Sequence, residues 1–214
     1  LRDINQAILS SNIPIACLVY PKGARAASAG TFILYACHIA AMAPATTLGA
    51  ATPVNIGGDS SQKEGASKDP SAMEKKVLND SIAYIRSLAQ LRGRNAKWAE
   101  SAVRDAATLS SEEALKKNVV NFIAESPIAL LKKLNGFKVT INEAERVLST
   151  DNALLEQKAP DWRNQFLSTT TNPNIAYLLM MVGIYGLILE FYSPGIGFGG
   201  IIGGICLLIA VYAF

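Results

Sequence analysis

Residues Ile15–Pro44 read IACLVYPKGARAASAGTFILYACHIAAMAP, and this stretch decides the fold class. Ile15–Tyr20 is a short apolar run of strand length, and Ile39–Ala43 is a second one. Between them lie a turn-rich loop, Pro21–Ala27, and a helical stretch that starts at Ser28. A strand, a loop, a helix and a strand in this order form a βαβ unit, which predicts an α/β domain with a parallel sheet covered by helices.

Periodicity and capping residues predict further elements on both sides of this unit. The stripe Val77, Ile82, Ile85 and Leu88 or Leu91 has the three- and four-residue spacing of an amphipathic helix. Ser110 and Glu113 have the spacing of a capping box. Helices are expected over 3–10, 71–91, 95–103, from 110 onward and over 126–134. A strand is expected over 118–124, and a hairpin or edge strand over 137–141. Residues 55–70 are expected to form a mobile surface loop.

The last forty residues differ in composition from the rest of the chain. The 214 residues are 50% hydrophobic and 17% charged, yet Glu190 is the one charged residue after position 174. Residues 175–192 are just long enough to span a bilayer, and 201–214 begin a second span that the sequence cuts off. Glycines such as Gly183, Gly186 and Gly203 suit close helix contacts in lipid. The predicted organisation is a domain over 1–141, a connector over 142–174 and a multi-pass membrane part over 175–214.

Composition excludes several classes of function. The net charge is +3 without a long basic run, so nucleic acid is not expected as a partner. A single histidine excludes metal sites with several histidines, and we expect no cofactor. The three cysteines are scattered and odd in number, which makes a disulfide framework unexpected.

Ser28 is a candidate nucleophile because it lies between small residues where a helix begins. Its neighbours Ala27, Ala29 and Gly30 would let a substrate backbone approach. The start of the helix offers backbone N–H groups and a partial positive charge. On local grounds alone, Ser28 reads equally as a serine that caps the helix.

A serine nucleophile needs a base. His38 lies ten residues after Ser28, about 15 Å along a helix, so it cannot be that base and is expected to be a partly buried structural residue. A partly desolvated lysine is the remaining choice. Of the twelve lysines, Lys76 is the best candidate because it starts the 71–91 helix beside Val77 and Leu78.

Several blocks of the chain resemble one protein family. Tyr20–Val54, Lys76–Asn95 with its IAYIRSLAQLRGRN run, Ser110–Ser126 and Asn172–Ala213 are similar, in this order, to the NfeD family of membrane-bound, ClpP-class serine proteases. The resemblance implies a ClpP/crotonase-like domain, incomplete at its N-terminus, followed by transmembrane helices.

The resemblance also implies a site and its partners. Ser28 would be the nucleophile, Lys76 the base of a Ser–Lys dyad and the Ala29 N–H one oxyanion donor. The family's second donor is a glycine pair expected before Leu1, so this chain alone would be inactive. The implied substrates are hydrophobic peptides or membrane proteins, with a stomatin-like partner. The implied setting is a homo-oligomer in the bilayer of a prokaryotic plasma membrane, with the protease domain outside the cytoplasm.

Three other functions stay open at this stage. A signal-peptide-peptidase-A-type protease shares the fold and a Ser–Lys pair, but the two glycine-rich spans favour the NfeD family. A non-catalytic membrane scaffold for stomatin-like proteins would need neither Ser28 nor Lys76. An acyl-CoA hydratase of the same fold would need neither these residues nor the membrane spans.

Overall fold

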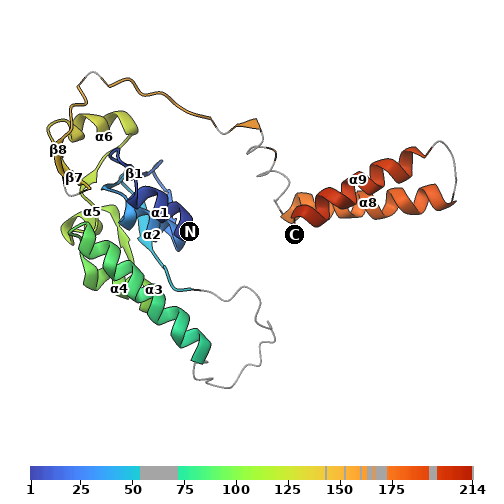
Figure 1. The fold of residues 1–214 in the computed structure, drawn as a ribbon, viewed down its shortest axis with the longest axis horizontal. Coiled ribbons are helices and arrows are strands. Elements are labelled where there is room, and N and C mark those ends of the chain that lie inside the picture. The colour runs from blue at the N-terminus through green and yellow to red at the C-terminus, as the bar shows by residue number, and fades with distance from the viewer. Residues whose placement is uncertain are drawn as a thin grey trace. The chain divides into compact units, whose positions relative to one another are not determined.

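The computed structural model describes residues 1–53, 72–142, 144–151, 153–159, 161–162, 166, 173–192 and 197–213. The loop predicted over 55–70 and most of the connector's second half lie outside these residues. The chain divides into two compact units, Leu1–Leu155 and Glu156–Phe214 (Figure 1). Each unit is described by itself.

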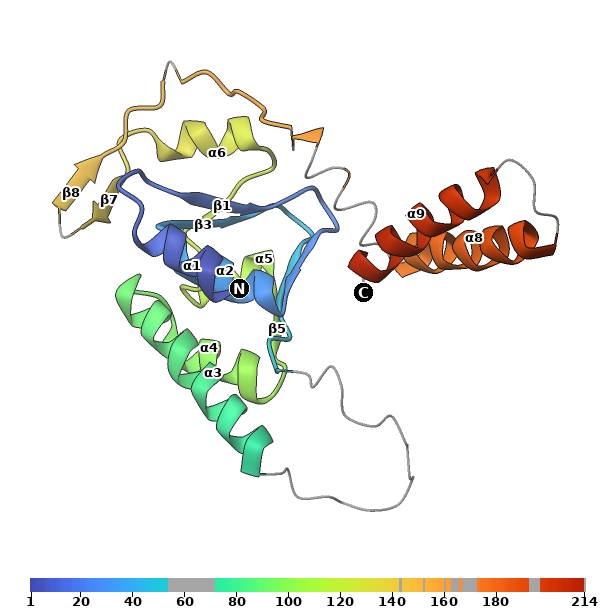
Figure 2. The same ribbon diagram turned by 45° about the vertical axis from the view of Figure 1, so that its right-hand side comes forward.

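A parallel sheet forms the centre of the first unit, as the βαβ pattern predicts. Its strand order is β1-β3-β6, formed by β1 (Ala16–Val19), β3 (Ile39–Met42) and β6 (Phe122–Ile123). Between β1 and β3 the chain forms a further strand and then helix α2 (Ala29–Ala36). Figure 2 shows β1 and β3 between α6 (Pro127–Leu134) on one face and α1 (Arg2–Leu9) and α2 on the other.

The middle strand β3 is buried on both faces. Ala40 and Met42 belong to the larger core, which α2 and the helices near it complete. Ile39 and Ala41 belong to a smaller core with residues of α6. Side chains alternate between the faces of a strand, so a strand covered on both sides needs a continuous apolar run.

The predicted helices are present, and their caps are confirmed. They are α1 (Arg2–Leu9), α3 (Ala72–Leu91), α4 (Ala96–Arg104), α5 (Ser111–Lys116) and α6. Asn95 caps α4 by accepting a hydrogen bond from the Trp98 N–H at 2.9 Å. Ser110 and Glu113 form the expected capping box of α5.

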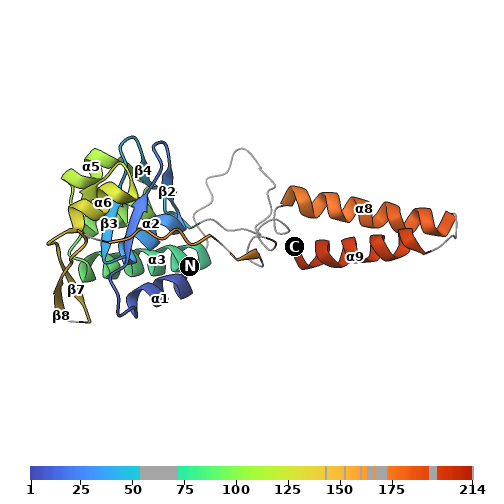
Figure 3. The ribbon, with the colours of Figure 1, turned by 90° about the horizontal axis from the view of Figure 1, so that it is seen from above.

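The second sheet was not predicted, whereas a hairpin that includes residues 137–141 is present, as one of the two predicted alternatives. Strands β2 (Arg25–Ala27), β4 (Thr47–Gly49) and β5 (Thr108–Ser110) pair in the order β2-β4-β5, and Figure 3 shows β2 beside β4. The hairpin joins β7 (Lys138–Ile141) to β8 (Ala144–Val147). Strands of three residues are too short for an alternating pattern, so β2 was interpreted as a loop. The strand expected over 118–124 is reduced to β6.

The apolar stripe of α3 is shorter than predicted. Ile82, Ile85 and Leu88 are buried, but Val77 is 38% exposed and Leu91 is 63% exposed. Figure 1 shows the N-terminal end of α3 extending beyond the strands, where there is less core for Val77 to join.

A buried arginine holds the C-terminal end of α2. Arg94 is 6% exposed, and its Nη1 donates to the carbonyl of Leu34 at 2.7 Å. Its Nη2 donates to the Cys37 carbonyl at 3.0 Å and to Asn121 Oδ1 at 3.1 Å. Burial lowers the pKa of Arg94 to about 10, so it is charged at neutral pH. Its donors satisfy carbonyls that have no partner within the helix.

Cys17 and Cys37 form a disulfide, which corrects the sequence-based expectation. It joins β1 to the residue that follows α2, with the two Cα atoms 6.1 Å apart. The twenty residues between the cysteines hid the pairing, because the sequence does not show that α2 returns the chain to β1.

The second unit is a pair of apolar helices, α8 (Pro173–Tyr192) and α9 (Phe198–Ala213). Among the described residues, one stretch, Asn174–Tyr192, is long and apolar enough to cross a membrane, with a mean hydropathy of 1.8. The apolar run in α9, Gly199–Tyr212, is shorter than a span. The predicted second span is therefore not confirmed.

Glycines let α8 and α9 approach closely. A Cβ on Gly203 would lie 2.8 Å from the Gly183 carbonyl oxygen, and one on Gly186 would lie 2.9 Å from that of Gly199. Glu190 of α8 also accepts hydrogen bonds at 3.1 Å from the N–H groups of Gly197 and Gly199. The one carboxylate side chain within α8 and α9 thus satisfies donors at the start of α9.

We predict that Gly203→Ala separates α8 from α9, because its methyl group would collide with backbone. Gly204→Ala is the matched control, since nothing lies within 4 Å of a Cβ at Gly204. Hydrogen–deuterium exchange of the full chain in micelles should speed up in peptides of both helices for Gly203→Ala alone. Equal exchange in the two variants would contradict this close contact.

Candidate active site

Ser28 lies on a sharp turn between β2 and α2. Its φ of 50° and ψ of −117° are unusual for a residue with a side chain. The Ser28 N–H donates to the carbonyls of Gly49 at 3.3 Å and Ala50 at 3.2 Å, which fixes this conformation. A strained strand-to-helix turn that exposes a serine resembles the nucleophile turn of α/β hydrolases.

The hydroxyl of Ser28 does not cap α2. Ser28 occupies the N-cap position, but its side chain makes no capping hydrogen bond, and the residue is exposed. Thr31 anchors the first turn instead, because its buried hydroxyl donates to the carbonyls of Ala26 at 3.1 Å and Gly49 at 3.0 Å. The interpretation of Ser28 as a helix cap is therefore not supported.

Gly49 is the residue that holds this turn in place. Its φ is +135°, and a Cβ there would lie 2.1 Å from the Ala107 carbonyl oxygen. Its own carbonyl accepts from both Ser28 and Thr31. Sequence reasoning missed Gly49 because its partners lie in strands that were not predicted.

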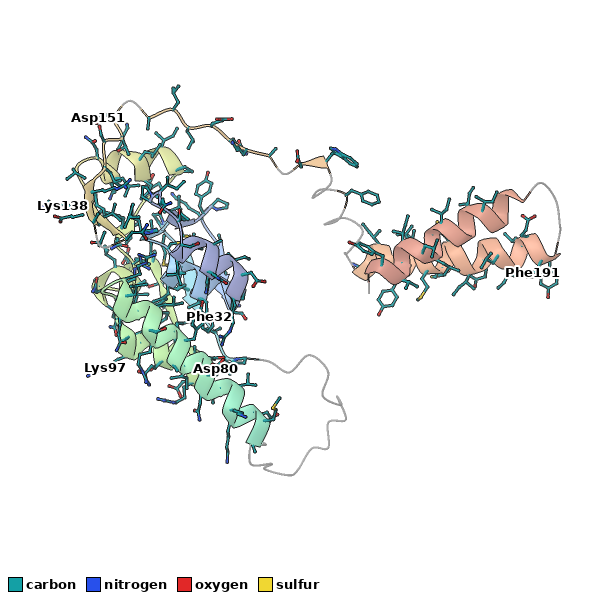
Figure 4. The ribbon with its side chains drawn as sticks, in the orientation of Figure 1. Phe32, Asp80, Lys97, Lys138, Asp151 and Phe191 are labelled. Atoms are coloured by element: carbon teal, nitrogen blue, oxygen red, sulfur yellow. A yellow bond between two sulfur atoms is a disulfide. The ribbon has the colours of Figure 1, made fainter. Side chains whose placement is uncertain are left out.

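A cavity of about 210 Å³ opens beside Ser28. Ser28, Ala29 and Phe32 line it from the side of α2, and Asp80, Ser81 and Tyr84 line it from α3. The rings of Phe32 and Tyr84 stack with their centroids 5.9 Å apart, so this part of the wall is apolar. Figure 4 labels Phe32 and Asp80, which lie close to each other where α2 faces α3.

An ion pair lies at the same cavity. Arg2 of α1 pairs with Asp80, and its guanidinium lies 5.0 Å from the centre of the Tyr84 ring. Both charged side chains are more than half exposed, so the pair contributes little to stability.

Lys76 lies on α3, one turn before Asp80, and is exposed. It is not among the described residues that line the cavity. Positions 76, 80 and 84 follow one another at four-residue spacing and therefore share one side of the helix. The structure thus brings Ser28 and Ala29 together at the cavity and leaves Lys76 beyond its edge.

His38 is a structural residue, as predicted. It is 8% exposed, and its Nδ1 accepts a hydrogen bond from the Ile15 N–H at 3.3 Å. Burial lowers its pKa below the usual range, and the charges of Arg92 and Arg94 lower it further. It lies after the C-terminal end of α2, whereas Ser28 lies before the N-terminal end.

Comparison with known proteins gives matches in both units. Residues 174–214 match the family described as the NfeD integral membrane domain. The chain is 39% identical over 218 residues to membrane-bound protease PH1510 of Pyrococcus horikoshii, which covers 100% of the chain and 47% of that protein. The chain therefore spans about half the length of this relative.

Two solved structures are similar to the chain. One is a lysine-to-alanine mutant of the 1510-N membrane-bound stomatin-specific protease in complex with a substrate peptide. It is 39% identical to this chain with a TM-score of 0.68, and the match covers 78% of this chain and 74% of that one. The other is a serine-to-alanine mutant of the same protease, with 41% identity and a TM-score of 0.64 over 75% of each chain.

We predict that Gly49→Ala destabilises the first unit by more than about 3 kcal/mol, because its methyl group would push β4 away from β5. The matched control is Gly23→Ala. Gly23 also has a positive φ, +85°, but nothing lies within 4 Å of its Cβ position, so we expect a cost of about 1 kcal/mol. Urea unfolding followed by tryptophan fluorescence measures both costs. Similar costs would show that the contact with Ala107 is unimportant.

Proposed function

Because the chain belongs to the NfeD family of membrane-bound proteases, we propose that it is part of a membrane-anchored serine endopeptidase. Ser28 is the nucleophile and Lys76 is the general base. The observation that carries the proposal is the exposed, uncapped Ser28 on a strained turn beside a cavity with an apolar wall. No metal or cofactor takes part.

The proposed reaction has two steps. The uncharged amine of Lys76 accepts the proton of the Ser28 hydroxyl as Oγ attacks the peptide carbonyl. The tetrahedral intermediate collapses, and the proton on Lys76 passes to the leaving amine. Water, deprotonated by Lys76, then attacks the acyl-enzyme. The acid leaves as the proton on Lys76 passes to Oγ of Ser28, which restores the hydroxyl and the amine.

The start of α2 supports the negatively charged intermediate. Ala29 is the first residue of α2, so its N–H has no partner within the helix and can donate to an anion formed at Ser28. The positive end of the helix dipole acts in the same direction. A second oxyanion donor is expected from a part of the protein outside this chain.

Two observations support Lys76 as the base. The similar protease was studied as a serine mutant and as a lysine mutant, and the lysine mutant was solved with a substrate peptide. In this chain Lys76 shares one side of α3 with Asp80 and Tyr84, which line the cavity.

The proposed substrate is an apolar peptide segment, such as one of a stomatin-like membrane protein. Phe32 and Tyr84 give the cavity an apolar wall for a substrate side chain. The disulfide between Cys17 and Cys37 favours a location of the protease domain outside the cytoplasm, because disulfides persist in oxidising compartments. A homo-oligomer with several membrane spans is part of the same proposal.

A non-catalytic scaffold is the second candidate, and the exposure of Lys76 outside the cavity favours it. The two functions make different demands on Ser28. A scaffold needs the fold of the first unit, whereas a peptidase also needs a reactive hydroxyl.

We predict that a fluorophosphonate probe labels Ser28 in the full-length protein and that Ser28→Ala abolishes labelling. Lys76→Met should slow labelling at least about hundredfold, because general-base catalysis contributes about that much. Lys75→Met is the matched control, since Lys75 is exposed on the neighbouring position of the same helix. The labelling rate of each variant is measured by mass spectrometry.

Two outcomes would contradict this assignment. Absence of labelling in a folded wild-type protein would favour the scaffold. Equal rates for Lys76→Met and Lys75→Met would remove Lys76 from the mechanism and leave Ser28 with another base.

We also predict that one acidic residue in the substrate blocks cleavage. A fluorogenic peptide with leucine next to the cleaved bond should lose about tenfold or more in kcat/KM when that leucine is replaced by aspartate. A carboxylate against the rings of Phe32 and Tyr84 loses its hydration, and Arg2, the cation at this cavity, is already paired with Asp80. Replacement by methionine, which keeps the size and apolar character, is the control. Equal cleavage of all three peptides would contradict binding of this side chain against Phe32 and Tyr84.

A further inference from the structure

A second cavity lies at the opposite end of α2 from Ser28, and the proposed peptidase does not use it. Its volume is about 310 Å³, and its polar lining includes His38, Arg92, Asn121, Lys138 and Thr140. These residues come from the C-terminal end of α2, the turn after α3, the start of β6 and the strand β7. Figure 4 labels Lys138 at the outer edge of the unit, away from Phe32 and the first cavity.

The neutral polar groups at this cavity are placed as hydrogen-bond donors. Nδ1 of His38 already accepts from the Ile15 N–H, so the neutral ring carries its proton on Nε2. Oδ1 of Asn121 accepts from the Ala40 N–H at 2.9 Å and from Arg94 at 3.1 Å. The amide NH₂ of Asn121 therefore remains to donate elsewhere.

Two cations complete the set of donors. Nε of Arg92 donates to the Ala36 carbonyl at 2.9 Å, which leaves the rest of its guanidinium for a ligand. Lys138 pairs with Glu145 at 3.5 Å, but both side chains are more than half exposed, so the lysine can exchange this partner at small cost. Among the described residues that line the cavity, none is acidic.

The C-terminal end of a helix normally repels anions, because its carbonyls carry a partial negative charge. Here those carbonyls are occupied. Arg92 binds the Ala36 carbonyl, and Arg94 binds those of Leu34 and Cys37. The charge of the buried Arg94 lies directly behind the cavity wall that Asn121 forms.

We propose that this cavity binds a phosphate group. Its oxygens accept hydrogen bonds in several directions, as the donors of His38, Asn121 and Arg92 require, and its negative charge matches Arg92 and Lys138. The phosphate belongs either to a free ion or to the headgroup of an anionic lipid. The proposal does not depend on the peptidase activity.

The single histidine of the chain makes His38 a probe that needs no assignment. The full chain, labelled with ¹³Cε1-histidine, is studied by NMR in micelles of a neutral detergent. Inorganic phosphate is added at constant ionic strength against chloride. We expect the His38 signal to shift and saturate.

A bound anion would also change the titration of His38. Arg92, Asn121 and Lys138 line the cavity with His38. Burial and the charges of Arg92 and Arg94 hold the pKa of His38 below the usual range. Phosphate favours the imidazolium form, so it should raise the pKa of His38. By linkage, phosphate should bind more tightly as the pH falls through the pKa of the bound state.

Matched variants test whether the site is specific. Lys138→Gln and Arg92→Gln should each weaken phosphate binding about tenfold, the effect expected for one charge-assisted hydrogen bond. Lys133→Gln removes an equal charge from an exposed position of α6 that does not line the cavity, and it should bind as wild type does. A midpoint of urea unfolding equal to that of wild type, followed by tryptophan fluorescence, shows that each variant is folded.

Nanodiscs distinguish the two sources of phosphate. One outcome is that the His38 signal shifts in nanodiscs of phosphatidylglycerol, stays unchanged in those of phosphatidylcholine, and does not respond to inorganic phosphate. This outcome would assign the site to a lipid headgroup. A saturable response to inorganic phosphate assigns it to a soluble group. No specific shift in either experiment, or an equal shift with chloride, would overturn the proposal.

Discussion

The first unit depends on hydrogen bonds to backbone carbonyls that hold both ends of α2. At the C-terminal end, the guanidinium of Arg94 binds carbonyls of α2 and the side chain of Asn121, which precedes β6. At the N-terminal end, the Gly49 carbonyl accepts from Ser28 and Thr31. The bonds of Arg94 join the helix to the parallel sheet and to the turn after α3. The bonds to Gly49 join the helix to the other sheet. The position of Ser28 therefore depends on residues far from it in sequence.

A charge as deeply buried as that of Arg94 is tolerated because its Nη groups are surrounded by acceptors. An uncompensated cation in this position would cost several kcal/mol, whereas five carbonyl and amide oxygens replace its hydration. A lysine has three donors on one nitrogen and cannot reach acceptors spread over this distance. The turn after α3, Gly93–Asn95, is therefore attached to the core through Arg94 and is not a solvent-exposed loop.

The sequence predicted the elements whose signals are local. The edge strand β1, the buried strand β3, the amphipathic α3 and the caps at Asn95, Ser110 and Ser126 each follow from neighbouring residues. The strands β2, β4 and β5 were missed because three residues carry no period. The disulfide and the role of Gly49 were missed because both depend on contacts between segments that only the folded chain brings together.

The candidate site also combines features that neighbouring residues predict with features that depend on contacts between distant segments. A serine among small residues at the start of a helix can be recognised locally, but the cavity beside it requires Asp80 and Tyr84 from α3. Two signals point to Lys76 as the base: its position at the start of α3 and the family resemblance. The number of turns between it and the cavity depends on how α3 packs, which the apolar stripe alone does not fix. The exposed side chain of Val77 shows the same limit, because the apolar stripe predicted that α3 contacts the core from Val77 onward, about one turn before it does.

The two ends of α2 offer different chemistry for physical reasons. The N-terminal end presents unpaired N–H groups, so the backbone itself can stabilise an oxyanion at Ser28. The C-terminal end presents carbonyls, so an anion can be held there only after cationic side chains have occupied those carbonyls. Arg92 and Arg94 do this, and they bring enough positive charge to reverse the polarity of that end. A single short helix can therefore face an anionic intermediate at one end and an anionic ligand at the other, with the chemistry at each end supplied by different groups.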